Sequence, residues 1–219
     1  MPASSIAPIS PVSIPLSGEW SFSIDEDQVG EQQGWMNPNF DDTSWVTVNV
    51  PHTWNVMPEH SEYEGIGWYR RAFSIPMEAQ NAHLRLRFDA VFYLARVWLN
   101  GQYLGQHEGG YTPFEFDITS LAKAGEENVI AIQVDNLRAT NRIPVVIRPD
   151  WSFDWWNYGG ITRQVSLEMT SQVYIARQKI VSVLISPAWT RRIQLQYQQL
   201  SQSTIPPAVP WRVQSKPIF

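Results

Sequence analysis

The sequence contains no cysteine. This absence excludes disulfide bonds, thiolate metal ligands and a cysteine nucleophile, but it leaves the compartment open, because a secreted protein can also lack disulfides. No apolar run approaches the roughly 20 residues that a membrane-spanning helix needs. Basic residues are also in deficit: 16 lysines and arginines stand against 21 aspartates and glutamates, a formal net charge of −5. Nucleic-acid binding requires a basic surface, so we expect neither a nucleic acid nor a membrane as a partner.

Sequence motifs for metal binding and for the catalytic serine of a hydrolase are missing as well. The four histidines are scattered, with no pair four residues apart and no thiol beside them, so the sequence predicts neither a metal site nor a cofactor. Loop aspartates and carbonyls can bind calcium, but no segment has the spacing of a calcium loop. A Gly-x-Ser-x-Gly nucleophile elbow is also absent, which argues against a Ser-His-Asp hydrolase.

Aromatic and turn-forming residues are abundant. The 11 tryptophans and 8 tyrosines can fill a core, and such rings also stack on flat ligands such as sugars. The 16 prolines and 12 glycines are spread along the chain, which suits many short strands better than long helices. Because no long helical pattern is present, neither a Rossmann fold nor a TIM barrel can be built from this chain.

Alternating apolar residues predict β-strands along most of the chain. In Ala82–Phe88 apolar residues alternate with His83, Arg85 and Arg87, so one face of the strand is buried and the other is wet. Asn100-Gly101 lies between two such segments and is the strongest short signal for a hairpin turn. Further strands are predicted at Trp20–Ile24, Trp68–Ile75, Ile130–Val134 and Val165–Met169.

One helical turn is predicted among these strands, at Ile118–Ala122. Asp117 or Thr119 would cap it and Gly125 would end it. With eight to ten strands of irregular spacing, the predicted fold class is all-β, a jelly-roll β-sandwich with a short C-terminal β extension.

The chain divides into three segments by composition. Residues 1–15 form a flexible N-terminal segment without the basic start and long apolar stretch of a signal peptide, so the cytoplasm is the default location. Residues 16–172 are the predicted jelly roll. Residues 173–219 begin as a strand-like segment but are too few for a sandwich of their own. We expect them to be either the start of a second β-domain or a tail wrapped on the first.

Eight short stretches occur in the order found in one enzyme family: Leu16–Trp20, Trp45–Trp54, Gly67–Phe73, Phe88–Val91, Val97–Gly101, His107–Asp117, Asn128–Asn136 and Tyr158–Arg163. Through these stretches the chain resembles the N-terminal sugar-binding domain of glycoside hydrolase family 2, which includes β-galactosidases, β-mannosidases and β-glucuronidases. The resemblance implies a jelly roll like that of galactose-binding domains. It also implies that residues 173–219 are the truncated start of the family's immunoglobulin-like second domain.

The same resemblance bears on catalysis. The family's catalytic glutamates lie on a TIM barrel that follows the two β-domains, and this chain ends before any such barrel. The resemblance therefore implies a non-catalytic piece with no catalytic residues of its own. Its expected partners are a mono- or oligosaccharide, a catalytic barrel domain and a further copy of the chain.

The candidate carbohydrate site is a segment in which two carboxylates are interleaved with aromatic rings: Asp150, Trp151, Asp154, Trp155, Trp156 and Tyr158. Carboxylates accept hydrogen bonds from sugar hydroxyls, and rings pack on the apolar C–H face of a sugar. The resemblance implies that the aspartate before the aromatic pair, Asp154 by position, reaches the sugar in the barrel's active site. In the alternative interpretation the aromatics close the sandwich and Asp154 caps a turn.

Two further features carry charge. Glu108, before a pair of glycines, would lie in a ligand groove, unless His107–Tyr111 is only a loop between strands. Arg70-Arg71 lies on a strand and is interpreted as a cross-strand surface pair, with contact to a carboxylate as the alternative.

Three functional hypotheses follow. The first is carbohydrate binding by the non-catalytic domain of a family 2 glycosidase, which helps to form the sugar site. The second is hydrolysis of β-glycosides, either by a longer parent protein or by an unrecognised pair among Asp150, Asp154, Glu108 and Glu115. Such a pair would need a separation of about 5–5.5 Å or about 6.5–9.5 Å. The third is a purely structural brace for the barrel, which large exposed aromatics would favour.

Overall fold

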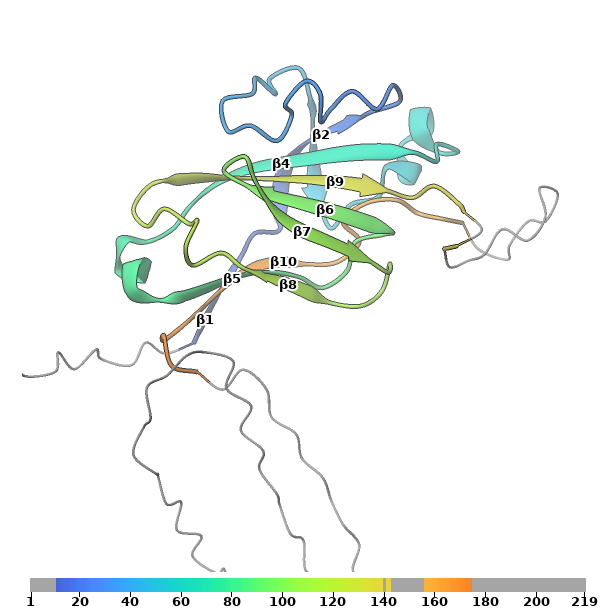
Figure 1. Ribbon diagram of the computed structural model, residues 1–219. Helices are drawn as coiled ribbons and strands as arrows, with labels where there is room; N and C mark the ends of the chain where they lie inside the picture. Colours follow the sequence, from blue (N-terminus) through green and yellow to red (C-terminus); the bar gives the residue numbers. More distant parts are fainter. Residues whose placement is uncertain (1–10, 140, 143–155, 175–219) are drawn as a thin grey trace, which may run out of the picture. The chain divides into compact units, whose positions relative to one another are not determined.

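The computed structural model describes residues 11–139, 141–142 and 156–174 (Figure 1). These residues form ten β-strands and three short 3-10 helices, which confirms the all-β prediction. The elements are, in order, β1 (Val12–Pro15), β2 (Gly18–Ile24), β3 (Val46–Val50), η1 (Trp54–Val56), η2 (Pro58–His60), β4 (Ile66–Ser74), η3 (Met77–Asn81), β5 (His83–Phe88), β6 (Leu94–Leu99), β7 (Gln102–Glu108), β8 (Phe114–Asp117), β9 (Glu127–Asp135) and β10 (Val165–Thr170). No helix among these elements is long and apolar enough to cross a membrane.

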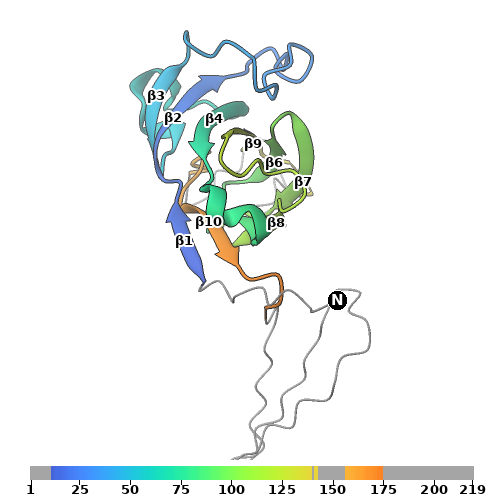
Figure 2. The ribbon, with the colours of Figure 1, turned by 90° about the vertical axis from the view of Figure 1, so that its left-hand side faces the viewer.

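Two antiparallel sheets form the sandwich. The smaller sheet has the order β1-β10-β5-β8, and the larger has the order β3-β2-β4-β9-β6-β7. Figures 1 and 2 show the two sheets as separate layers in both views. The arrangement is the predicted jelly-roll β-sandwich.

The main core lies between the two sheets. On β5 the buried residues Leu84, Leu86 and Phe88 alternate with partly exposed polar residues, as the sequence predicts. They pack in one cluster with buried aromatic rings of the larger sheet, among them Trp20 and Tyr69. Because side chains of a strand point alternately to opposite faces, this alternation sets which face of each strand enters the core.

The predicted hairpin forms between β6 and β7. Asn100 has a φ of 53° and Gly101 a φ of 84°, so both turn residues adopt the left-handed conformation that this dipeptide favours. Glu108 is the last residue of β7, so it lies at the end of the hairpin that is opposite to the turn.

The predicted helical turn forms, and three short helices form that the sequence did not predict. Ile118–Ala122 forms a single turn, in which the Ala122 N–H donates to the Ile118 carbonyl at 2.8 Å and Asp117 accepts from the Thr119 N–H. It does not extend into a helix. The helices that form are η1, η2 and η3, each of three to five residues, which is too short to leave a helical repeat in the sequence.

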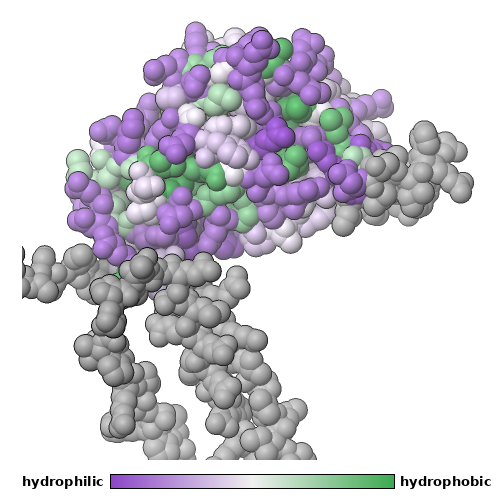
Figure 3. Space-filling view, in the orientation of Figure 1, coloured by the Kyte–Doolittle hydropathy of each residue, from purple (hydrophilic) through white to green (hydrophobic). Residues whose placement is uncertain are grey.

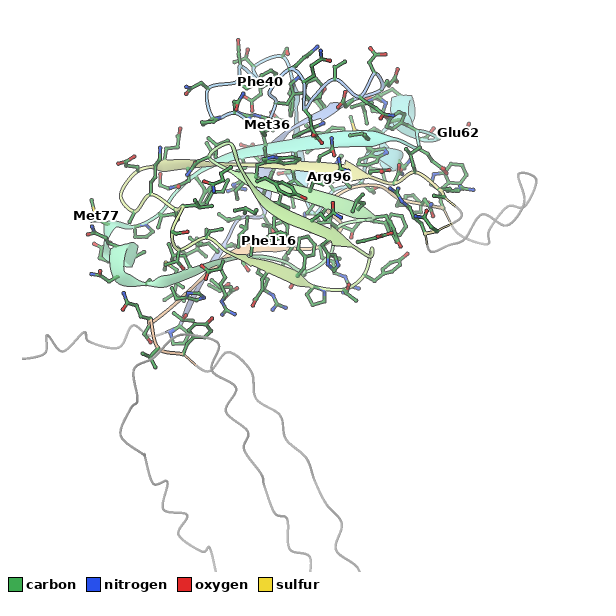
Figure 4. The ribbon with its side chains drawn as sticks, in the orientation of Figure 1. Met36, Phe40, Glu62, Met77, Arg96 and Phe116 are labelled. Carbon is green, nitrogen blue, oxygen red and sulfur yellow. The ribbon has the colours of Figure 1, made fainter. Side chains whose placement is uncertain are left out.

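A long loop, residues 25–45, covers the outer face of the larger sheet. Trp35 of the loop packs with Trp68 and Trp98 of the sheet to form a second, smaller apolar cluster. The outward surface of this part of the molecule is mostly hydrophilic (Figure 3, top). Figure 4 shows Met36 and Phe40 on the loop, above Arg96 of β6. This second cluster has no local signal in the sequence and was not predicted.

The interpretation of Arg70-Arg71 as a surface pair is wrong. Arg70 is 3% exposed, and its Nε donates to Asp42 at 2.9 Å, while its other nitrogens donate to the carbonyls of Trp35 and Phe40. Arg71 donates to the carbonyls of Leu16 and Ser17. Arg70 therefore contacts a carboxylate, as in the alternative interpretation, and fastens the long loop to the sheet.

Candidate functional site

The loops at one end of the sandwich form the candidate site, called the site end below. The registers place Ile66 beside Asp135, Asp135 beside Leu94, and Leu94 beside Glu108. In the smaller sheet Phe88 lies beside Val165 and Phe114. The site end therefore carries the loops 51–65, 89–93 and 109–113, residues 136–139 and 141–142, and the segment 156–164.

Three of the predicted site residues lie at the site end. Trp156 is 38% exposed and Tyr158 is 50% exposed, and Glu108 is exposed at the end of β7. Asp150, Trp151, Asp154 and Trp155 lie outside the described residues. The segment that carries Trp156 and Tyr158 thus reaches the same end of the sandwich as Glu108.

The backbone around Tyr158 is tied to two other loops. The Gly159 N–H donates to the side-chain oxygen of buried Asn55 at 2.8 Å, and its carbonyl accepts from the Trp54 N–H at 3.1 Å. The carbonyl of Asn157 accepts from the Asn136 side chain at 2.7 Å. The segment is therefore held by buried partners while its two aromatic side chains face solvent.

Gly160 lets this segment lie close against the backbone of His52 and the side chain of Tyr69. It exchanges two backbone hydrogen bonds with Phe92, of 2.9 and 3.1 Å. An added Cβ would lie 2.4 Å from the His52 carbonyl oxygen and 2.7 Å from the Tyr69 hydroxyl, and φ is +141°. Only glycine fits here without displacing the chain.

Two arginines bring charge to the site end. Arg138 pairs with Glu64 at 2.6 Å and lies 5.5 Å from the centre of the Trp156 ring. Arg142 pairs with Asp135 at 2.7 Å. The hydrogen bond to Asp135 raises the pKa of Arg142, and the negative charge of Glu108 contributes to this rise.

Sequence reasoning missed both arginines. Both arginines follow the end of β9. Binding residues concentrate in loops at strand ends, so this position in the sequence could have indicated them as site residues.

A histidine lies beneath the site end against a buried tyrosine. His52 Nδ1 lies 2.8 Å from the hydroxyl of fully buried Tyr69. Burial lowers the pKa of His52 to about 4. His52 is therefore neutral at pH 7, and a neutral ring lets Nδ1 accept from the Tyr69 hydroxyl. Burial also raises the pKa of Tyr69 well above its usual value, which keeps that hydroxyl protonated.

The exposed surface of the site end carries a third aromatic ring. Tyr111 is 66% exposed and meets the Phe92 ring edge-on at 5.6 Å between ring centres. Two open cavities of about 400 Å³ occur elsewhere, and neither is lined by Trp156, Tyr158 or Glu108. Within the described ranges no three acidic or histidine side chains gather as metal ligands. Glu115, a candidate for a carboxylate pair, is engaged by Arg85 at 3.0 and 3.2 Å.

Comparison with known proteins decides the family. The family model described as "Glycosyl hydrolases family 2, sugar binding domain" matches residues 14–171. The chain belongs to this family. As a family 2 sugar-binding domain, it is 36% identical over 143 residues to a β-galactosidase of Thermoanaerobacter pseudethanolicus, a match that covers 63% of this chain and 19% of that protein. It is 34% identical over 165 residues to a β-glucuronidase of Bacteroides fragilis, covering 74% of this chain and 21% of the relative.

Solved structures agree with this assignment. The domain superposes on a β-glucuronidase of Lactobacillus rhamnosus with a TM-score of 0.72 and 30% identity, covering 83% of this chain and 32% of that one. A β-glucuronidase of an uncultured Clostridium gives a TM-score of 0.71 at 30% identity, covering 82% and 33%. The chain thus spans about a fifth of the curated relatives described above and about a third of these structures, consistent with the non-catalytic domain of a family 2 glycosidase.

Proposed function

We propose that this sugar-binding domain is the non-catalytic part of a family 2 glycosidase that acts on β-galactosides or β-glucuronides. The names of the relatives support this substrate class, and the share of their length that the chain spans supports the non-catalytic role. In this proposal residues 16–172 are the jelly roll, and residues 173–219 begin a second β-domain or wrap back on the first.

One observation carries the proposal. Trp156 and Tyr158 remain exposed although the backbone beside them is fastened to buried Asn55 and Asn136. A rigid backbone lowers the entropic cost of ordering such side chains against a ligand. We assign these two rings, together with Glu108 and with Asp150, Trp151, Asp154 and Trp155 of the preceding segment, to a sugar site shared with a catalytic domain.

The experiment follows the indole N–H signals of the ¹⁵N-labelled chain during titration with galactose and with glucuronate. The proposal expects saturable shifts of the Trp156 signal, assigned by Trp156→Phe, and their weakening in Tyr158→Ala. A matched control is Tyr103→Ala, because Tyr103 is a half-exposed tyrosine at the opposite end of β7. Absence of any saturable shift at up to about 50 mM sugar, where even a millimolar site would be filled, would overturn the proposal of a sugar site in this domain.

A second candidate function is favoured by Tyr111. This exposed ring, with Trp156 and Tyr158, gives the site end an exposed aromatic surface, which suits an interface with a catalytic barrel. In this candidate the domain braces the barrel and binds no sugar alone. This candidate would be supported if an added barrel domain shields these rings from solvent while added sugar causes no shift of their signals.

A further inference from the structure

The loop 25–45 carries a cavity that is remote from the site end. The cavity has a volume of about 410 Å³ and is lined by six residues: Gln33, Gly34, Asn37, Pro38, Asn39 and Phe40. This volume falls within the range of small-molecule sites, roughly 300–1,000 Å³. An added Cβ on Gly101 would lie 3.3 Å from Pro38 and 3.5 Å from the Asn37 side chain, so the cavity borders the tip of the β6–β7 hairpin. Glu108 lies at the other end of that hairpin, about 20 Å away at the usual rise of a strand.

The lining contains three carboxamides and no charged side chain. The side chains of Asn37 and Asn39 are exposed and make no hydrogen bond in the described part of the chain. Gln33 uses only its oxygen, which accepts from the Trp35 indole at 3.0 Å. The three carboxamides therefore retain donors, and two of them retain acceptors, for a ligand.

The charged residues around the cavity are already engaged. Glu31 pairs with Arg96 at 3.0 Å, and Asp42 pairs with buried Arg70. The Asp41 carboxylate accepts two hydrogen bonds from Thr43, which lower its pKa. Asp41 thus stays negatively charged and both arginines are paired with carboxylates, so an anionic ligand would find no free positive charge here, whereas a hydroxyl, which both donates and accepts, matches a carboxamide.

The cavity wall is rigid because the loop is fastened to the sheet. The Asn37 N–H donates to the Gly34 carbonyl and the Phe40 N–H to the Asn37 carbonyl, so two consecutive turns carry the lining. Arg70 donates to the carbonyls of Trp35 and Phe40, and its guanidinium lies 5.4 Å from the Phe40 ring centre. The backbone that carries the carboxamides is therefore held in place before a ligand binds, so that only their side chains must be ordered on binding.

We infer that this cavity is a second carbohydrate-binding site, which takes a neutral mono- or disaccharide. The carboxamides hydrogen-bond its hydroxyls, and the Phe40 ring offers an apolar surface to its C–H groups. The site is independent of the site end, and its ligand need not be the substrate of a catalytic domain. A shallow site with few hydrogen bonds corresponds to a dissociation constant of about 1–10 mM.

The test is a titration of the ¹⁵N-labelled chain with cellobiose and with lactose, read at the side-chain NH₂ signals of Gln33, Asn37 and Asn39. We expect saturable shifts at these signals and much smaller shifts with glucuronate, which carries a charge. The double variant Asn37→Ala/Asn39→Ala should weaken binding about tenfold or more, since each lost hydrogen bond costs several-fold. Gln32→Ala, an exposed carboxamide outside the lining, should change nothing.

The outcomes separate this site from the proposed function. Shifts confined to Trp156, or shifts that rise linearly without saturation, overturn the second site and leave the proposal for the site end standing. Saturable shifts at the three carboxamides in a Trp156→Ala background support the second site even if the site end binds nothing. Unchanged urea midpoints in the variants show that any loss of binding is not a loss of folding.

Discussion

The side-chain oxygen of Asn55 accepts a hydrogen bond at 2.8 Å from the N–H of Gly159, 104 residues further along the chain. The side-chain nitrogen of Asn55 donates at the same time to the Tyr63 carbonyl at 2.9 Å. One buried carboxamide thus joins the loop between β3 and β4 to the segment that presents Trp156 and Tyr158. The geometry of the site end depends on this contact between residues that are distant in sequence.

Asn55→Ala should therefore destabilise the domain and loosen the site end together. The buried Gly159 N–H loses its partner, which costs about 1–3 kcal/mol of unfolding free energy. Urea unfolding measures the loss, and Asn49→Ala, an exposed asparagine on β3, serves as control with an expected change within about 0.5 kcal/mol. Equal effects of the two variants would contradict the role given to Asn55.

Gly160 and Gly109 form a matched pair of glycines. Their φ values are +141° and +130°, but an added Cβ would meet the His52 carbonyl at 2.4 Å in one case and nothing nearer than 3.4 Å in the other. Both alanine variants bear the backbone strain, about 1–3 kcal/mol. Gly160→Ala should lose about 1–3 kcal/mol more, since the chain must also move apart. If urea unfolding gives the same loss of unfolding free energy for both variants, the contact of Gly160 with the His52 carbonyl has no energetic effect.

The stability of the domain should depend on pH through His52. Its folded pKa is about 4 against an ordinary 6.5, so the unfolded state binds more protons between these values. The contribution of His52 to the free energy of unfolding is therefore fully present above about pH 6.5 and falls as the pH drops towards 4. Below pH 4 this contribution changes little. The ring is only half-buried, so after allowance for solvent screening the loss is on the order of 1–2 kcal/mol.

His52→Gln should flatten this pH dependence. Urea unfolding at intervals from pH 7 to pH 4 measures it for both proteins. Asp117, whose pKa is lowered, titrates below its ordinary 3.8 and stays outside this window. Parallel curves for His52→Gln and the unsubstituted chain would contradict the assignment.

Removal of the carboxylate should cost more stability in a buried ion pair than in an exposed one. Asp42→Asn leaves the Arg70 guanidinium buried without its counter-charge, and we expect a loss of about 2–4 kcal/mol that persists in 1 M NaCl. Glu115→Gln removes the exposed partner of Arg85 and should cost at most about 1 kcal/mol, screened by the same salt. Similar losses in both variants would contradict the role of Arg70 in fastening the long loop.

The sequence predicts those elements whose signal is local. The alternation along Ala82–Phe88 and the Asn100-Gly101 turn are local, and β5 and the β6–β7 hairpin form where they are predicted. The folding of residues 25–45 over the outer face is not local, because it depends on Trp35 meeting Trp68 and Trp98. Arg70 was misplaced for the same reason, since its partner Asp42 lies on that loop.

Apart from Glu108, the candidate site was predicted from one segment of sequence, and only the last part of that segment is described. Trp156 and Tyr158 are exposed at the site end, where Glu108 also lies. Arg138 and Arg142 come to the same end because neighbouring strands finish together, which depends on strand order. Strand order follows from pairing across the whole chain, so no single motif reveals it.

The most direct test of the central claim is a paired measurement on the purified chain. Calorimetric titration with galactose, glucose, mannose and glucuronate is made beside an assay for hydrolysis of the corresponding chromogenic β-glycosides, both repeated in the Asn37→Ala/Asn39→Ala background to remove the second site. Our account predicts binding without turnover, retained in that background and lost in Trp156→Ala and Asp154→Ala. Turnover that disappears on substitution of Asp150 or Asp154, or binding that survives both Trp156→Ala and Asp154→Ala, would contradict it.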